Sequence, residues 1–184
     1  VGQKLLYKLQ EKGLVGLVYW ENGFRNLTNN KRSVNSLEDL GGIKLRVMQN
    51  NVFLETFKTL GANAIPLSFS ELFTALETQA VDGQENPFNT ILTSKFYEVQ
   101  KYMSLTRHAY TAMPVVMNKK KFDGLKPEQQ QALIEAAQAA GTYQRDLIKK
   151  NEAADIAFLR SQGMQVEENI NLVPFRKLVA EPIK

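Results

Sequence analysis

The segment GIKLRVMQNN (Gly42–Asn51), continued by LGANAIPLSFSELFTALETQAVDGQENP (Leu60–Pro87), decides the fold of this chain. Apolar and basic side chains alternate from Ile43 to Val47, which is typical of a β-strand with one packed face. From Asn51 to Leu60 the apolar residues instead recur at helical spacing, and Gly61 stands where a C-terminal cap is expected. The first half of the segment therefore predicts a strand that leads into a helix.

The second half of the segment repeats this order. A short strand is expected from Ala64 to Leu67, and Ser68-Phe69-Ser70-Glu71 has the spacing of a capping box at the start of a helix. Val81-Asp82-Gly83 then indicates a strand end, Gln84-Glu85-Asn86-Pro87 is expected to form a polar turn, and a short helix is expected from Phe88 to Thr93. Alternating strands and helices favour an α/β domain with a largely parallel sheet.

Regular structure is also expected on both sides of this segment. Short apolar runs predict strands at Leu14–Trp20, Met113–Met117 and Met164–Val166. A helical pattern extends from about Glu128 to Gln162, and at about 1.5 Å per residue such a helix reaches roughly 50 Å. Because that length exceeds what one small domain needs, we expect the helix either to bridge two lobes or to break near Gly141.

The composition is that of an ordinary globular protein: of 184 residues, 43% are hydrophobic and 23% are charged, with a net charge of +4. No run approaches the roughly 20 apolar residues of a membrane helix. The chain begins with Val rather than Met, which indicates processed or truncated material, so the lack of a signal peptide does not fix the compartment. The absence of cysteine excludes disulfides, thiolate nucleophiles and cysteine zinc sites.

Arg46 is the best single candidate for a binding residue. It lies near the carboxyl end of a predicted strand, where open α/β sheets place their ligands. Its planar guanidinium can hold a carboxylate through two parallel hydrogen bonds. On pattern alone, a surface arginine or a salt bridge to a helix remains open.

Other polar and aromatic residues are candidates with equally plain alternatives. Asn86 and Glu85 lie in the expected turn, where they could bind a ligand or simply build the turn. Arg25 follows the predicted turn Asn22-Gly23 and could be a second cationic contact or an exposed, idle side chain. Phe69 could form the wall of an apolar part of a site, although its spacing also fits a core position.

The sequence does not favour an enzyme or a nucleic-acid-binding protein. His108 is the only histidine and has no recognisable catalytic partner, so a structural role or a hydrogen bond near a pocket fits it better. The basic run Lys119-Lys120-Lys121 lacks interleaved aromatic residues and is expected to be solvated. Phosphate-binding loops, nucleophile motifs and metal-ligand spacings are absent, so no catalytic residue, cofactor or metal is expected.

Several motifs occur together in a fixed order along the chain. They are GIKLRVMQ, LGANAIPLSFSELFTALET, VDGQENP and KFYEVQKYMSLTRHAY, preceded by WENGFRNLTNNKR. With these motifs the chain resembles the solute-binding subunit of TRAP (tripartite ATP-independent periplasmic) transporters, of the DctP-like family. The resemblance covers roughly Leu14 to Val173.

The resemblance implies a periplasmic-binding-protein-like fold of two α/β lobes, joined by hinge strands and by one long helix, with the ligand in the cleft between them. Because family members are longer, most of the amino-terminal lobe is expected to be missing. Residues 1–22 would then end that lobe and form the first crossover, and residues 23–111 would form the carboxyl-terminal ligand-binding lobe. Residues 112–184 would supply return segments, the bridging helix and the tail.

The resemblance also assigns the site. Arg46 would form a salt bridge with the ligand carboxylate, and the other implied ligand-binding residues are Asn86, Arg25, Glu85, Phe69 and Gln49. His108 and Tyr110 lie near the expected return crossing and are weaker candidates. Glu85 can accept hydrogen bonds from hydroxyl groups but repels a second carboxylate, so it favours a sugar acid slightly over a C4-dicarboxylate.

The implied function is that of a periplasmic protein that captures an organic acid, either a C4-dicarboxylate or a sugar acid, and delivers it to the TRAP permease subunits in the membrane. The alternative is a ligand-sensing module of the same fold that signals to a membrane receptor. With half of the cleft missing, tight binding is expected to fail, and exposed apolar surface on the bridging helix would favour self-association.

Overall fold

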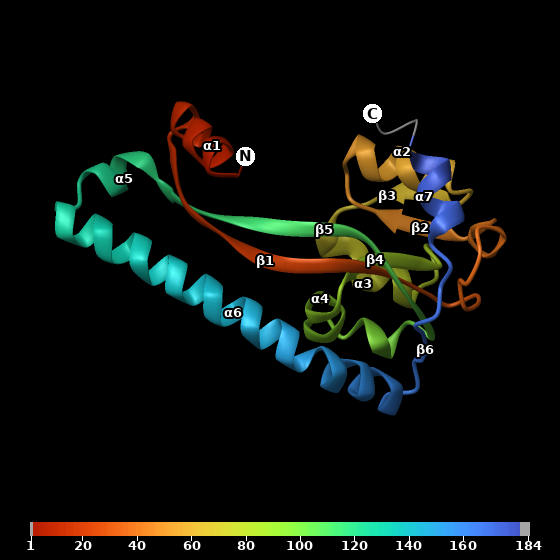
Figure 1. The fold of residues 1–184 in the computed structure, drawn as a ribbon. Helices are drawn as coiled ribbons and strands as arrows, with labels where there is room; N and C mark the ends of the chain where they lie inside the picture. The colour runs from red at the N-terminus through yellow and green to blue at the C-terminus, as the bar shows by residue number, and fades with distance from the viewer. Residues whose placement is uncertain (1, 181–184) are drawn as a thin grey trace. The chain divides into compact units, whose positions relative to one another are not determined.

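The computed structural model describes residues 2–180 (Figure 1). Its helices and strands are, in order, α1 (Gly2–Lys8), η1 (Leu9–Lys12), β1 (Leu14–Asn29), η2 (Glu38–Leu40), β2 (Lys44–Val47), α2 (Asn51–Thr59), β3 (Asn63–Pro66), α3 (Phe69–Glu77), β4 (Gly83–Pro87), α4 (Phe88–Thr93), η3 (Phe96–Glu98), β5 (Tyr102–Asn118), α5 (Lys119–Asp123), α6 (Pro127–Ser161), β6 (Gln165–Glu167) and α7 (Val173–Val179).

The strands form one mixed sheet in the order β3-β2-β4-β1-β5-β6. β2 runs parallel to both β3 and β4, and β5 runs parallel to β6. β4 is antiparallel to β1. The α/β class is therefore confirmed. The sheet is less parallel than expected because β1, which precedes the segment Gly42–Pro87, pairs antiparallel with β4 at the end of that segment.

Two predicted turns are wrong, and both errors have the same cause. β1 continues through Asn22-Gly23 to Asn29, and the expected turn at residues 84–87 is the buried strand β4. Each stretch supplies the hydrogen-bonding partner of the other, with Arg25 opposite Pro87 and Asn29 opposite Gly83. Neither partner is visible in the local sequence of the other.

Gly83 permits this pairing at close range. A Cβ atom placed on Gly83 would lie 2.2 Å from the carbonyl oxygen of Thr28, which is far inside van der Waals contact. The glycine is therefore required by the approach of the β1 backbone, rather than by a turn conformation.

The helices follow the sequence pattern more closely. α2, α3 and α4 lie where the sequence predicted helices, and α4 has the predicted bounds. The capping box is not formed as expected, because Ser68 makes no side-chain bond to the helix backbone and its hydroxyl instead contacts the Glu71 carboxylate.

α6 extends from Pro127 to Ser161 without a break near Gly141. A Cβ atom on Gly141 would lie 2.9 Å from Cδ1 of Trp20, whose Nε1 donates a 2.9 Å hydrogen bond to the Ala137 carbonyl. Gly141 thus lets the indole of β1 lie directly against the helix.

The contacts divide the chain into two compact units. One contains residues 1–23 and 110–152, and the other contains residues 24–109 and 153–184, so that β1, β5 and α6 each continue from one unit into the other. The second unit holds two apolar clusters, one around α2, α7 and β2 and one around α3, α4 and the end of α6. The six residues that the resemblance assigned to ligand binding and the weaker candidate His108 belong to this unit, whereas Tyr110 belongs to the first. In residues 2–180, no helix combines the length and apolarity needed to cross a membrane.

Candidate functional site

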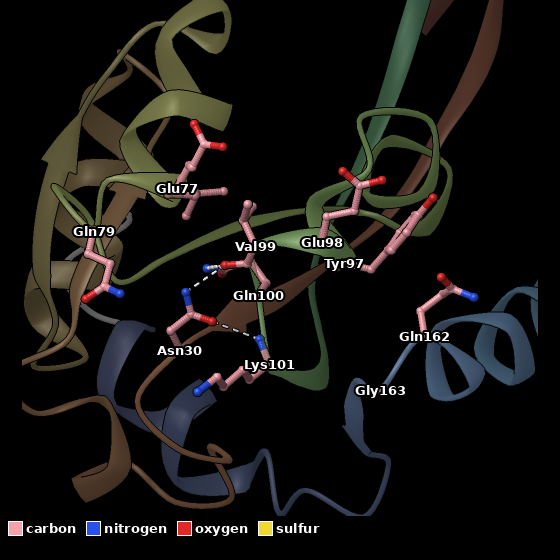
Figure 2. Close-up of a pocket in the computed structure, with 11 residues that line it drawn as sticks. Asn30, Glu77, Gln79, Tyr97, Glu98, Val99, Gln100, Lys101, Gln162 and Gly163 are labelled. Carbon is pink, nitrogen blue, oxygen red and sulfur yellow. Dashed lines mark hydrogen bonds between the residues drawn. The ribbon is translucent and has the colours of Figure 1, made fainter.

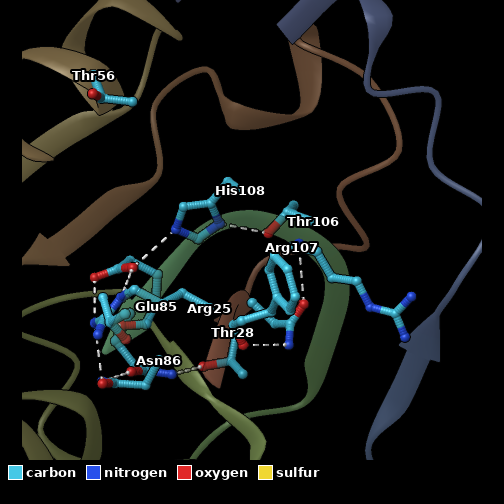
Figure 3. A network of polar contacts seen from close by, with 12 residues as sticks. Arg25, Thr28, Thr56, Glu85, Asn86, Thr106, Arg107 and His108 are labelled. Atoms are coloured by element: carbon cyan, nitrogen blue, oxygen red, sulfur yellow. Dashed lines mark hydrogen bonds and ion pairs between the residues drawn. The ribbon is translucent and has the colours of Figure 1, made fainter. Parts of the chain in front are cut away.

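A buried ion pair joins β1 to β4 (Figure 3). Nε of Arg25 donates to Oε2 of Glu85 at 2.5 Å, and Nη2 of Arg25 donates to Oε1 at 2.7 Å and to the Glu85 carbonyl oxygen at 2.6 Å. Arg25 is 2% exposed and Glu85 is fully buried. The two residues are 60 positions apart in the sequence, and antiparallel strand pairing brings them together. Glu85 lies opposite Leu27 in the register, and Arg25 is two residues before Leu27 on the same strand.

A chain of amide and hydroxyl contacts continues from the ion pair. Oδ1 of Asn86 accepts a 3.1 Å bond from Nη2 of Arg25, and Nδ2 of Asn86 donates to Oε1 of Gln84 at 2.5 Å. Nε2 of Gln84 donates to Oγ1 of Thr28 at 2.9 Å, and that hydroxyl donates to Oε1 of Gln100 at 2.8 Å. All of these side chains are buried, so their orientations are fixed by one another.

His108 completes the set around Glu85. Its Nε2 lies 2.9 Å from Oε2 of Glu85, and its Nδ1 lies 2.8 Å from Oγ1 of Thr106 on the same strand. The ring also meets Phe57 of α2 edge to face, with centroids 5.1 Å apart. The sequence treated His108 as a weaker candidate, whereas the structure places it in direct contact with Glu85.

These contacts keep Glu85 ionised. Burial by itself would raise the pKa of this carboxyl group, but the hydrogen bonds from His108 and Arg25, together with their charges, hold the pKa below its ordinary value. Both carboxylate oxygens are occupied by these two partners. Direct contact of Glu85 with a ligand stays a prediction, and the structure shows it as the anion that orients Arg25.

Arg46 differs from Arg25 in how its donors are used. It is 3% exposed at the end of β2, and its Nε donates a 2.8 Å hydrogen bond to the Leu67 carbonyl. Burial lowers the pKa of its guanidinium, and the nearby charge of Glu85 opposes that effect. Within residues 2–180, its terminal amino groups have no hydrogen-bond acceptor.

Those terminal amino groups are not completely buried. In the described part of the chain, every fully buried side-chain nitrogen or oxygen has a hydrogen-bond partner. An amino group of Arg46 without a partner is therefore accessible. The arrangement leaves the outer edge of the guanidinium, the part that can hold a carboxylate with two bonds, unoccupied.

The other two predicted residues lie outside the network. Phe69 begins α3 and is 51% exposed, with its ring 6.1 Å from that of Phe96. Gln49 is exposed in the bend between β2 and α2. The structure thus joins Arg25, Glu85 and Asn86 directly and leaves Phe69 and Gln49 free of polar contacts with them.

The sequence missed several residues that hold the site together. Thr28, Gln84, Gln100 and Thr106 gave no motif signal, because each acts through a partner on another strand or loop. Phe53 was identified only as a periodic helix residue, yet its ring lies 5.4 Å from Cζ of Arg25. Among residues 2–180, no group of three or more acidic or histidine side chains is arranged to hold a metal ion.

A separate pocket of about 430 Å³ contains none of the predicted site residues (Figure 2). The Asn30 side chain on its wall donates to the Val99 carbonyl at 2.6 Å and accepts from the Lys101 backbone at 2.9 Å. The buried amide of Gln100 beside it is likewise bonded to backbone carbonyls. The amides of Asn30 and Gln100 at this pocket are therefore already hydrogen-bonded within the protein, in contrast to the terminal amino groups of Arg46.

Comparison with known proteins identifies the class. The whole chain, residues 1–184, matches the family model described as "Bacterial extracellular solute-binding protein, family 7". The chain therefore belongs to the DctP family of solute-binding proteins.

Named relatives agree with this assignment. The chain is 43% identical over 184 residues to the 2,3-diketo-L-gulonate-binding periplasmic protein YiaO of Escherichia coli, covering 100% of this chain and 56% of that protein. It is 40% identical to the sialic acid-binding periplasmic protein SiaP of Vibrio cholerae, covering 92% and 52%. The chain thus spans about half the length of the curated relatives it matches.

Solved structures show the same fold. The sugar acid binding protein DctPAm of Advenella mimigardefordensis, in complex with galactonate, superposes with a TM-score of 0.94 at 49% identity, covering 99% of this chain and 59% of that one. A TRAP periplasmic solute-binding protein of Polaromonas, bound to D-erythronate, gives a TM-score of 0.94 at 44% identity, with 98% and 60% covered. The predicted periplasmic-binding-protein-like α/β fold is confirmed by these likenesses.

Proposed function

We propose that this chain forms the carboxylate-holding part of a solute-binding protein that captures a hydroxylated organic acid outside the cytoplasm and delivers it to a TRAP membrane permease. The observation that carries the proposal is the state of Arg46. Its Nε is anchored to the Leu67 carbonyl, while its largely buried terminal amino groups have no acceptor among residues 2–180 and keep some exposed surface. A ligand carboxylate supplies the missing charge and acceptors.

Arg25 adds a second donor of a different kind. Its Nε and Nη2 are used by Glu85 and Asn86, but within the described residues Nη1 has no acceptor. Because each fully buried polar side-chain atom in that range is bonded, Nη1 is also accessible. Its charge is already offset by Glu85, so it suits a neutral acceptor such as a ligand hydroxyl.

Counting charges favours a sugar acid over a C4-dicarboxylate. Glu85 forms its ion pair with Arg25 and acts on Arg46 only as a nearby charge, so Arg46 is the arginine that a ligand anion can pair with directly. One carboxylate provides this pairing, whereas a second would lie near Glu85 without a cation of its own. In keeping with this, similar solved structures hold galactonate, D-erythronate and β-D-galacturonate. A C4-dicarboxylate-binding relative from Bacillus subtilis, 35% identical, represents the other class.

The rest of the assignment follows from the family. We place the protein in the periplasm, with the membrane subunits of the permease as its partners, and residues 23–111 as the ligand-binding lobe. Phe69 and Gln49 are proposed to line the ligand on the side away from the ion pair. Self-association of the isolated chain is a further expectation, supported by exposed side chains such as Tyr143 and Leu147 on α6.

The test is a thermal-shift screen of the full-length protein against galactonate, glucuronate, gluconate, malate and succinate. A true ligand at 100 times its dissociation constant adds about 2.7 kcal/mol to the free energy of unfolding. We expect a shift with at least one sugar acid and its loss in Arg46→Ala. Arg176→Ala, which removes an exposed arginine of α7, is the matched control and keeps the shift. A shift that survives in Arg46→Ala refutes the site, and a dicarboxylate that outperforms every sugar acid refutes the charge argument.

A further inference from the structure

The guanidinium of Arg25 is in contact with an aromatic ring as well as with its hydrogen-bond acceptors. Glu85 and Asn86 take the bonds of Nε and Nη2 in the guanidinium plane. Cζ of Arg25 lies over the ring of Phe53, 5.4 Å from the ring centroid, inside the range of a cation–π contact. Phe53 is half-buried and packs against the apolar cluster that contains Leu27, two residues after Arg25 in β1.

The same helix face touches the other partner of Glu85. Phe57 follows Phe53 by four residues in α2, so both rings point from one side of the helix. Phe57 meets the edge of His108 at 5.1 Å, and His108 is bonded to Glu85. One helix thereby contacts both side chains that hydrogen-bond to the buried carboxylate, Arg25 and His108.

We propose that Phe53 is a positioning residue for Arg25: its ring fixes the plane of the guanidinium and excludes water from its face, so that Nη1 keeps one direction toward the ligand. Its contact is with Arg25, and its effect on binding acts through that arginine. The effect on ligand affinity rests on the proposed function, whereas the effect on Arg25 itself does not.

The physical reason lies in what the ring supplies that an aliphatic side chain lacks. The negative face of the ring attracts the cation, and this attraction weakens as ring electron density is withdrawn. Shape and apolar burial change little when ring hydrogens are replaced by fluorine. A series of phenylalanines with increasing ring fluorination at position 53 therefore separates the electrostatic contact from ordinary core packing.

The first experiment uses the ligand-free protein and side-chain ¹⁵N–¹H NMR. The Nε–H signal of Arg25, assigned by its loss in Arg25→Lys, is expected to be sharp and protected from exchange, because this group is buried and bonded to Glu85. Phe53→Leu is expected to speed its exchange about tenfold, Phe53→Tyr to restore the protection, and the fluorinated series to give graded rates. An unchanged Nε–H signal in Phe53→Leu overturns the proposal, whatever the protein binds.

The second experiment measures affinity by calorimetry with the sugar acid that gives the largest thermal shift. We expect Phe53→Leu to weaken binding about tenfold, which lies between the values for an exposed and a desolvated cation–π contact, and the fluorinated series to weaken it in steps. The matched control is Phe158→Leu, because Phe158 packs edge to face on Tyr97 at 5.4 Å and is remote from Arg25 in its contacts. An equal loss in both leucine variants, or no gradient with fluorination, contradicts the positioning role. Absence of any binding by the wild type refutes the proposed function and leaves the NMR result standing.

Discussion

The two buried arginines, Arg25 and Arg46, differ in how their positive charge is balanced within the protein. Arg25 lies between β1 and β4 and has a full anionic partner in Glu85 within the protein. Arg46 lies at the end of β2 with one bond to a carbonyl and an accessible outer edge. A buried cation without a counter-ion is costly. The comparison indicates that Arg25 chiefly stabilises the folded lobe, and it supports the proposal that Arg46 binds an anion from outside.

The sharpest test replaces each arginine in turn. Arg25→Ala leaves Glu85 buried without its main cation, so we expect the free energy of unfolding to fall by about 3–5 kcal/mol. Arg46→Ala strands no anion within the described residues, and we expect a fall of less than about 1 kcal/mol. Urea denaturation of the ligand-free protein measures both. If the two variants lose equal stability, the division of roles is wrong.

The carboxylate gives the next largest effect and adds a pH dependence. Glu85→Gln leaves Arg25 unpaired and is expected to cost about 3 kcal/mol at neutral pH. The pKa of Glu85 in the folded protein lies below its unfolded value of about 4.3. Its contribution to stability is therefore complete above that pH and is lost as the pH falls through the folded pKa.

The measurement is the free energy of unfolding of both proteins between pH 7 and pH 3. The wild type is expected to lose stability more steeply than Glu85→Gln below about pH 4.3. Parallel curves for the two proteins would mean that Glu85 is not held ionised by Arg25 and His108.

Strand pairing can be disturbed without touching a charge. Gly83→Ala places a methyl group 2.2 Å from the Thr28 carbonyl oxygen. We expect this overpacking to lower the free energy of unfolding by about 3 kcal/mol. The control is Gly124→Ala, where the nearest atom lies at 3.5 Å and little change is expected. Thermal unfolding compares them. A tolerated Gly83→Ala would show that β1 and β4 can separate without loss.

The smallest expected effect belongs to His108. His108→Gln retains a donor for Glu85 but loses the ring contact with Phe57, and a loss of about 1 kcal/mol in unfolding free energy is expected. His108→Phe keeps a ring and leaves Glu85 without one donor, so it should cost more. Equal stability of the two variants would remove His108 from the set that holds the carboxylate. Together these variants rank three contributions to the free energy of unfolding: the buried charge pair, the pairing of β1 with β4, and the contacts of His108.

Sequence by itself determined the local elements and one binding candidate. Local sequence signals placed α2, α3 and α4, and the strand-end position singled out Arg46, because these signals depend on residues a few positions apart. The family motifs added Arg25, Asn86 and Glu85 as neighbours in one site. His108 received little weight, since a lone histidine carries no pattern.

Only the tertiary structure decided how these residues are used. The pairing of β1 with β4 turned an expected turn into a strand and brought Arg25 to Glu85 across 60 residues of chain. That contact gives Arg25 an anionic partner and leaves Arg46 without one. The ring of Phe53, on α2, adds a further contact to Arg25. Helical periodicity and capping are short-range properties of the chain, whereas strand register and the neutralisation of a buried charge depend on residues that only folding brings together.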